Sequence, residues 1–246
     1  MTRTKYKVLV VTVIVLVAML YQRSVLSAEI TEKGPVIGSQ IVIGKFAVDA
    51  TEVTVGQLKK KFRPAEKRTN AEQQGGGYEY SGGWVQRAGW VWHAPYGQSA
   101  TDSEPVVHIT WFEAKEHCSA IGGRLPTLDE WQLAAYTETR ELPTDGYEQG
   151  RTYRYPVGDE PTGMNTAGKD AWPRHAPAGM TRRGVNGLYD MGANVWEWLA
   201  DEKSDTALTA GGSWWYTEGK TQQHGAQYKP KDFAAVYIGF RCVYDK

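Results

Sequence analysis

The tract from residue 63 to residue 103 limits the folds open to this chain. It is rich in glycine and aromatic residues, including Gly75-Gly-Gly-Tyr-Glu-Tyr80, Trp84, Trp90 and Trp92, yet shows no regular hydrophobic period. The missing period argues against regular helices or strands, and the aromatic residues argue against disorder. We therefore expect a long packed loop, of the kind that often carries function.

The whole sequence shares this character, with ten Trp, fourteen Tyr and 27 Gly among its 246 residues. Such a composition predicts a loop-rich domain with little helix or strand, in which aromatic rings pack against glycine backbone. Basic and acidic residues balance at 28 each, which argues against binding to nucleic acid or to an anionic membrane surface. No repeat or linker divides the chain, so a single domain is predicted over residues 40–246.

The N-terminus has the pattern of an export signal. Basic residues in the first seven positions precede an apolar run from Val8 to Leu20, and Ser27 and Ala28 offer small residues for cleavage. The run is shorter than the roughly 20 apolar residues that a spanning helix needs. Residues 1–28 are predicted to be a signal peptide or, alternatively, an uncleaved N-terminal anchor that would be the only membrane contact. Either one places the domain in the periplasm or outside the cell.

Short elements can be predicted along the domain. Residues 41–43 and 46–49 read as strands rich in β-branched residues. A helix is expected over 55–62. Two more helices are expected to follow Thr110 and Thr127, because each threonine precedes a glutamate by three residues in a capping box. Residues 140–185 are expected to be irregular.

The last strand is predicted over residues 236–243, with Ile238, Phe240 and Cys242 pointing inward. Cys242 and Cys118 are the only two cysteines. In an oxidising compartment an even pair is most simply a disulfide, and the alternative is two buried free thiols.

Four elements in order carry a family resemblance: Glu104 to Ala114, Gly123 to Trp131, Asn186 to Trp198, and Gly211-Gly-Ser213 with Gly239-Phe-Arg-Cys242. From about residue 40 to its end, the chain resembles the formylglycine-generating enzyme, or sulfatase-modifying factor, family. The resemblance implies an α+β fold, a loop-rich variant of the C-type lectin-like fold with short strands and few helices. It also implies that Cys118 pairs with Cys242.

The resemblance breaks at the copper site. Enzymes of the family hold copper between two closely spaced cysteines just after the Gly-Gly-Ser element, and a soft Cu(I) ion selects such thiolates. Tyr216 and Thr221 stand at the matching positions here. We therefore expect neither copper nor the oxidation of a sulfatase cysteine by that mechanism.

Structural calcium is the predicted cofactor. Asn194 and Glu197 are expected to bracket a tight turn, and oxygen ligands suit a hard cation. Family members similarly place calcium at this Asn-x-Trp-Glu element, and Asn165 resembles part of a second site. Alternatively, Asn194 and Glu197 hydrogen-bond only the turn backbone.

A candidate pocket follows the Gly-Gly-Ser element. Trp214, Trp215, Tyr216 and Tyr228 suit a flat ring, a sugar or a peptide, although the two tryptophans could equally be core residues. Candidate catalytic residues are Ser213, which matches the serine of the family's active site, and Tyr216 and His224, which could transfer protons.

Whether the protein is an enzyme stays open at this point. One hypothesis is an exported, non-copper family member, similar to the pyoverdine-maturation type, that oxidatively matures a peptide or a phenolic substrate. The alternative is a non-catalytic binding or regulatory module on the same scaffold, serving secretion or signalling or acting as a ligand-binding variable protein. A sulfatase-activating formylglycine oxidase is the least favoured. The expected partner is a peptide, a protein or a small aromatic ligand.

Overall fold

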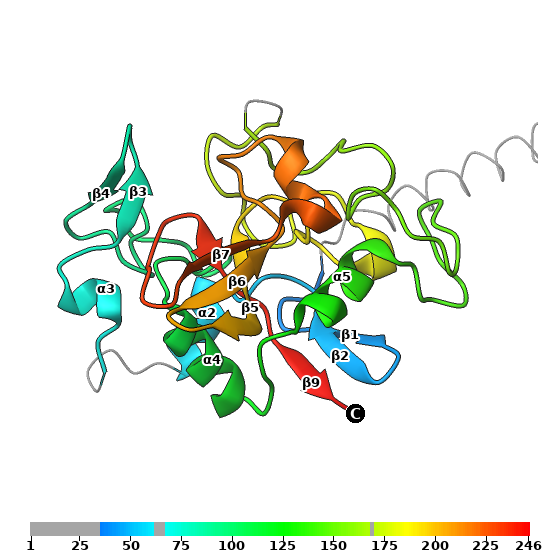
Figure 1. Ribbon diagram of the computed structural model, residues 1–246, viewed down its shortest axis with the longest axis horizontal. Coiled ribbons are helices and arrows are strands. Elements are labelled where there is room, and N and C mark those ends of the chain that lie inside the picture. Colours follow the sequence, from blue (N-terminus) through cyan, green and yellow to red (C-terminus); the bar gives the residue numbers. More distant parts are fainter. Residues whose placement is uncertain (1–34, 62–66, 168–169) are drawn as a thin grey trace, which may run out of the picture. The chain divides into compact units, whose positions relative to one another are not determined.

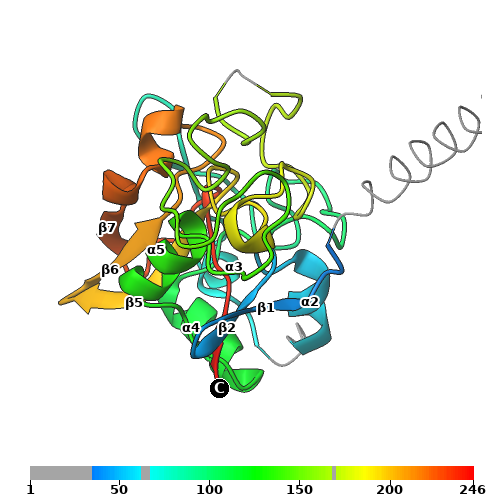
Figure 2. The same cartoon turned by 90° about the vertical axis from the view of Figure 1, so that its right-hand side faces the viewer.

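A computed structural model describes residues 35–61, 67–167 and 170–246 (Figures 1 and 2). The predicted signal peptide or anchor, residues 1–28, lies outside the described residues. Within the part that is described, no helix combines the length and apolar character needed to cross a membrane.

The two ends of the domain meet in one antiparallel sheet. Strands β1 (Gln40–Ile43) and β2 (Phe46–Asp49) form a hairpin, and β9 (Val243–Asp245) pairs with β2. The sheet order is therefore β1-β2-β9 (Figure 1). Both strands predicted near the start of the domain are confirmed.

The predicted helices are present as α2 (Val55–Lys61), α4 (Trp111–Ala120) and α5 (Leu128–Tyr136). Phe62, the last residue of the first predicted helix, lies outside the described residues. Both expected capping boxes form. In α4 the Thr110 hydroxyl accepts from the Glu113 backbone N–H, and the Glu113 carboxylate accepts from the Thr110 N–H. Each reciprocal pair satisfies two backbone donors that the first turn of a helix leaves unpaired.

A four-stranded sheet with the order β7-β6-β5-β8 forms the centre of the domain, and α4 and α5 pack on it (Figure 1). Its strands are β5 (Trp196–Lys203), β6 (Thr206–Ala210), β7 (Gln227–Pro230) and β8 (Ile238–Gly239). Buried tryptophans join the layers: Trp111 of α4 donates its indole N–H to the Leu199 carbonyl at 2.7 Å.

The aromatic tract holds more regular structure than its sequence predicts. It contains helix α3 (Asn70–Gln73) and a hairpin of β3 (Tyr78–Tyr80) and β4 (Trp84–Gln86). These elements are too short to show a hydrophobic period. The Trp84 ring packs edge-on against Phe233 at 4.7 Å, which fixes the hairpin to a segment far away in sequence.

The predicted last strand is wrong in its extent and its alternation. Only β8 and β9 are strands, and Gly239 and Arg241 are as fully buried as the predicted inward residues. The reason is that this segment crosses the core: β8 pairs in parallel with β5, and β9 pairs with β2. A segment enclosed on both sides has no solvent face to alternate with.

The disulfide between Cys118 and Cys242 is present, with the two Cα atoms 5.5 Å apart. Both cysteines are fully buried. The bridge therefore ties α4 to the last crossing of the chain through the core. Three 3₁₀ turns complete the described structure: η1 (Val185–Gly187), η2 (Glu218–Thr221) and η3 (Gln223–Gly225). Short strands, few helices and long connections make this the expected loop-rich α+β domain.

Candidate binding cleft

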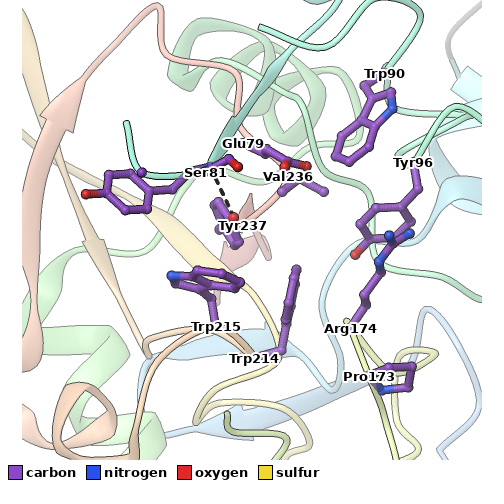
Figure 3. Close-up of a pocket in the computed structure, with 12 residues that line it drawn as sticks. Glu79, Ser81, Trp90, Tyr96, Pro173, Arg174, Trp214, Trp215, Val236 and Tyr237 are labelled. Atoms are coloured by element: carbon purple, nitrogen blue, oxygen red, sulfur yellow. Dashed lines mark hydrogen bonds between the residues drawn. The ribbon is translucent and has the colours of Figure 1, made fainter. Parts of the chain in front are cut away.

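An open cleft of about 490 Å³ lies among loops that are distant in the sequence (Figure 3). Its walls come from the β3–β4 hairpin, the loop that follows it, residues 173–174, residues 214–215 and residues 236–237. The aromatic residues that line it are Tyr80, Trp90, Tyr96, Trp214, Trp215 and Tyr237. A cleft rich in aromatic rings with a few polar groups is typical of a site for a small organic ligand or a peptide side chain.

One wall is a cluster of three rings. Trp214 and Trp215 meet edge-on at 5.7 Å, and Tyr237 lies 5.3 Å from Trp214 and 5.8 Å from Trp215. Trp215 is 45% exposed although it is large and apolar. The sequence left open whether these tryptophans are core residues, and the structure places both at the cleft.

The facing wall is polar. Figure 3 shows Tyr96 beside the guanidinium group of Arg174, across the cleft from Trp214. The Arg174 Cζ lies 4.0 Å from the centre of the Tyr96 ring, within the range of a cation–π interaction. Glu79 adds a carboxylate to the lining, so the cleft offers charge of both signs.

The Gly-Gly-Ser element explains how the two tryptophans reach the cleft. Gly211 and Gly212 have φ values of 94° and 76°, which residues with a Cβ rarely adopt. A Cβ on Gly211 would also lie 3.1 Å from the Met191 carbonyl oxygen. This turn ends β6, and the Trp214 backbone N–H then donates to the Asn194 carbonyl at 2.9 Å.

Ser213, a predicted catalytic residue, directly precedes Trp214 in the sequence but is not among the residues that line the cleft. Its side chain is fully buried, and its Oγ has no hydrogen-bond partner within the described part of the chain.

The other predicted pocket residues lie apart from the cleft lining. Tyr216 is half-buried against Trp196 at 5.6 Å, and burial raises the pKa of its hydroxyl. His224 is exposed in η3, and no described hydrogen bond or ring contact joins it to Tyr216. Tyr228 is 52% exposed on β7. The structure therefore brings Trp214 and Trp215 together and leaves Tyr216, His224 and Tyr228 outside.

The two positions that match the family's copper cysteines have roles in the fold. Thr221 is buried, its hydroxyl donates to the Glu218 carbonyl, and its own carbonyl accepts from the Tyr136 hydroxyl. Tyr216 packs on Trp196 as described above. Because Cys118 and Cys242 are joined to each other, the chain supplies no thiolate pair here.

The predicted calcium ligands are arranged around protein partners. Asn194 and Asn165 do meet, since the Asn165 amide donates to Asn194 Oδ1 at 2.9 Å. Asn194 in turn donates to the Glu52 carboxylate at 2.7 Å. The tight turn lies at Ala193 and Asn194, which have positive φ values, and Glu197 belongs to β5 instead.

Glu197 has both carboxylate oxygens engaged. Oε1 accepts from Arg241 Nη2 at 2.7 Å, and Oε2 accepts from Arg241 Nε and the Trp131 indole, each at 2.8 Å. A cation held by Glu197 together with Asn194 does not fit this arrangement. Among the described residues, no group of three or more His, Cys, Asp or Glu side chains is placed to hold a metal ion.

The sequence did not single out the polar wall. The density of aromatic residues in the 63–103 tract indicated a functional loop, but it could not select Tyr96. Arg174 and Tyr237 lie in segments with no motif that points to a site. Only their positions in the folded chain show their connection to Trp214 and Trp215.

Comparison with known proteins agrees with the resemblance. Residues 14–246 match the family described as the sulfatase-modifying factor enzyme 1-like domain. The chain is 27% identical over 254 residues to the inactive C-alpha-formylglycine-generating enzyme 2 of Bos taurus, covering 86% of this chain and 80% of that protein. It is 30% identical over 196 residues to the formylglycine-generating enzyme of Thermomonospora curvata, covering 63% of this chain and 61% of that enzyme.

A solved structure supports the fold. PvdO from Pseudomonas aeruginosa superposes with a TM-score of 0.60 at 17% identity, covering 82% of this chain and 80% of PvdO. The predicted loop-rich α+β fold is confirmed. Since the family match covers nearly the whole chain, this protein belongs to the sulfatase-modifying factor enzyme 1-like family, of which formylglycine-generating enzymes are members.

Proposed function

We propose that this protein is an exported, non-copper member of its family that binds a planar aromatic ligand, either a phenolic compound or an aromatic side chain of a peptide. The observation that carries the proposal is the three-ring wall of Trp214, Trp215 and Tyr237 facing Tyr96 and Arg174. Aromatic rings prefer edge-on and offset contacts with one another. The exposed part of this cluster can therefore make such contacts with the ring of a ligand.

The surroundings favour a ligand larger than one ring. A second hollow of about 600 Å³ adjoins the cleft and shares Pro173, Trp214 and Trp215 with it. A peptide or an extended phenolic compound could fill both, with its ring against the tryptophans and a polar group near Arg174.

The test is a thermal-shift screen of phenolic compounds and tyrosine-containing peptides against the wild-type protein and Trp215→Ala. Because Trp215 is 45% exposed, its loss should leave the unliganded Tm nearly unchanged. We expect a binding compound to raise the Tm of the wild type but not of Trp215→Ala. The matched control is Phe112→Ala, since Phe112 is 56% exposed and lies away from the cleft lining. Equal stabilisation of all three proteins, or of none, would contradict the proposal.

A second candidate is an enzyme that oxidises the ligand it binds. It is favoured by a hydrogen-bonded chain that runs from the cleft through a buried imidazole to a partly exposed carboxylate, Tyr96 to His175 to Glu104, because such a chain can carry a proton away from a bound ligand. Oxygen consumption in the presence of a compound found by the screen would separate the two functions. Binding without turnover supports the binding module.

A further inference from the structure

Behind the polar wall of the cleft, three side chains from separate segments form one chain of hydrogen bonds. The Tyr96 hydroxyl lies 2.9 Å from His175 Nδ1, and His175 Nε2 lies 2.9 Å from Glu104 Oε2. The His175 side chain is 2% exposed and that of Glu104 is 21% exposed, while Tyr96 lines the cleft. The imidazole is therefore the most buried of the three groups, with the phenol at the cleft on one side and the partly exposed carboxylate on the other.

The direction of these hydrogen bonds follows when His175 is neutral, the state in which it can accept a proton. The hydrogen bond from His175 holds the pKa of Glu104 below its usual range, so Glu104 is ionised at neutral pH and only accepts. Nε2 of His175 must then carry the proton that it shares with Glu104. In a neutral imidazole the other nitrogen, Nδ1, is an acceptor. The Tyr96 hydroxyl therefore donates to Nδ1, and its oxygen keeps lone pairs that can accept a hydrogen bond from the cleft.

The charges beside Tyr96 favour an anion there, since Glu79, the carboxylate of the cleft lining, is already paired with Arg87 at 2.8 Å. Arg174 places its guanidinium 4.0 Å from the centre of the Tyr96 ring. Burial lowers the pKa of His108, the other histidine that interacts with His175, to about 4, so it is neutral at neutral pH. Burial also raises the pKa of Tyr96 and of Tyr237, so both phenols stay protonated. Arg174 thus places a positive charge beside Tyr96, where the hydroxyl of a ligand would ionise.

We propose that Tyr96, His175 and Glu104 form a proton relay that recognises the acidic hydroxyl of a phenolic ligand in the cleft and accepts its proton. This inference rests on the proposed function, because it assigns the ligand class and the proton acceptor of the same cleft. Tyr96 touches the ligand, and His175 and Glu104 act through Tyr96.

The proton transfer balances without an oxidant. The O–H bond of the ligand breaks as an O–H bond forms on Tyr96, and the original Tyr96 O–H bond breaks as an N–H bond forms on His175 Nδ1. The products are a phenolate near Arg174 and an imidazolium paired with the Glu104 carboxylate. A carboxylate beside a histidine stabilises the imidazolium in the same way in the serine hydrolase triad.

Two probes separate the relay from aromatic packing. 4-Nitrophenol has an ionisable hydroxyl and a visible phenolate absorption, whereas 4-nitroanisole has the same ring but no acidic proton. We expect the wild-type protein to bind 4-nitrophenol about tenfold more tightly than 4-nitroanisole, as expected for one charge-assisted hydrogen bond. Bound 4-nitrophenol should also keep its phenolate absorption at a lower pH than the free probe.

His175→Gln removes the proton acceptor, and Tyr96→Phe removes only the hydroxyl that reaches the ligand. Both variants should lose the preference for 4-nitrophenol, and the bound probe should then titrate like the free probe. If the buried His175→Gln does not fold, Tyr96→Phe decides alone. The matched control is His93→Gln, because His93 forms a similar pair with Glu72 at 3.2 Å but lies outside the cleft lining. It should keep the wild-type preference.

The outcomes distinguish this inference from the function on which it rests. Equal binding of both probes by the wild type, or an unchanged preference in Tyr96→Phe, overturns the relay and leaves aromatic binding intact. If neither probe binds to the wild type, the relay and the proposed function fail together.

Discussion

Arg241 and Glu197 form a fully buried two-point ion pair, with Nη2 to Oε1 at 2.7 Å and Nε to Oε2 at 2.8 Å. Arg241 also donates to the backbone carbonyls of Asp49 and Tyr189. The ion pair and the hydrogen bond to Asp49 thus join β5, the segment after β8, and the end of β2. Breaking it should be costly because the remaining charge stays buried without a partner.

We therefore expect Arg241→Met to lower the free energy of unfolding by about 3–5 kcal/mol. Adding Glu197→Gln to that variant should recover part of the loss, since the unpaired carboxylate is gone. Lys59→Met is the control, because it breaks an exposed pair with Asp102 and should cost less than about 1 kcal/mol. Urea denaturation measures all of these variants, and similar losses for Arg241→Met and Lys59→Met would refute the argument.

Loss of the disulfide should destabilise the fold, because the bridge restricts the conformations of the unfolded chain and its removal makes unfolding more favourable. The bridge spans 124 positions, for which the chain-entropy model gives about 4–5 kcal/mol. A Cys118→Ala, Cys242→Ala double variant should unfold at a clearly lower urea concentration. Mass spectrometry of the unreduced wild type should find the two cysteine peptides linked, and free thiols there would disprove the bridge.

Stability should depend on pH through Asp49. Burial raises the pKa of this carboxyl from 3.8 to about 6 in the folded protein. Between these values the folded state binds more protons than the unfolded state, so the contribution of Asp49 is present below about pH 4 and is lost as the pH rises through 6. The pKa values of Glu52 and Asp190 are also raised by burial and act in the same direction.

The measurement for Asp49 is the difference between two unfolding curves. Asp49→Asn cannot ionise, so the stability of the wild type relative to this variant should fall between about pH 4 and pH 6. Other carboxyl groups titrate in both proteins and cancel in the difference. A difference that does not vary with pH would show that Asp49 has an ordinary pKa.

Calcium removal tests the role of Glu197 in a different way. An ion held by Asn194 and Glu197 would have to displace Arg241 from a buried pair, so we expect dialysis against a chelator to leave the Tm unchanged. A Tm that falls in chelator and returns with added calcium, together with bound calcium by metal analysis, would contradict this and would support the calcium predicted from the family resemblance.

Sulfatase-type activity should be absent. With Tyr216 and Thr221 in place of two cysteines, a copper-loaded sample has no thiolate pair to bind Cu(I). Incubation with a Cys-x-Pro-x-Arg peptide and oxygen should therefore yield no aldehyde, while a formylglycine-generating enzyme run in parallel converts it. Aldehyde formation above the level of a protein-free control would overturn the expectation.

The sequence by itself determined the parts of the structure that depend on near neighbours. The starts of α4 and α5 were predictable because a capping box is complete within four residues. The disulfide was predictable because only two cysteines exist. The family could be recognised because its motifs occur in the expected order. The absence of the copper ligands could be read from Tyr216 and Thr221, which stand at the positions of the two cysteines.

Only the tertiary structure decided which distant groups meet. The sequence predicts Glu197 as a calcium ligand, and only the fold shows that Arg241 contacts both of its carboxylate oxygens. Tyr96 and His175 are 79 positions apart, and His175 and Glu104 are 71 apart, so no local pattern links them. The physical reason is that a polar group acquires its hydrogen-bond partner and its degree of burial only when distant segments pack together. The partner and the burial then determine whether the group is charged and what chemistry it can perform.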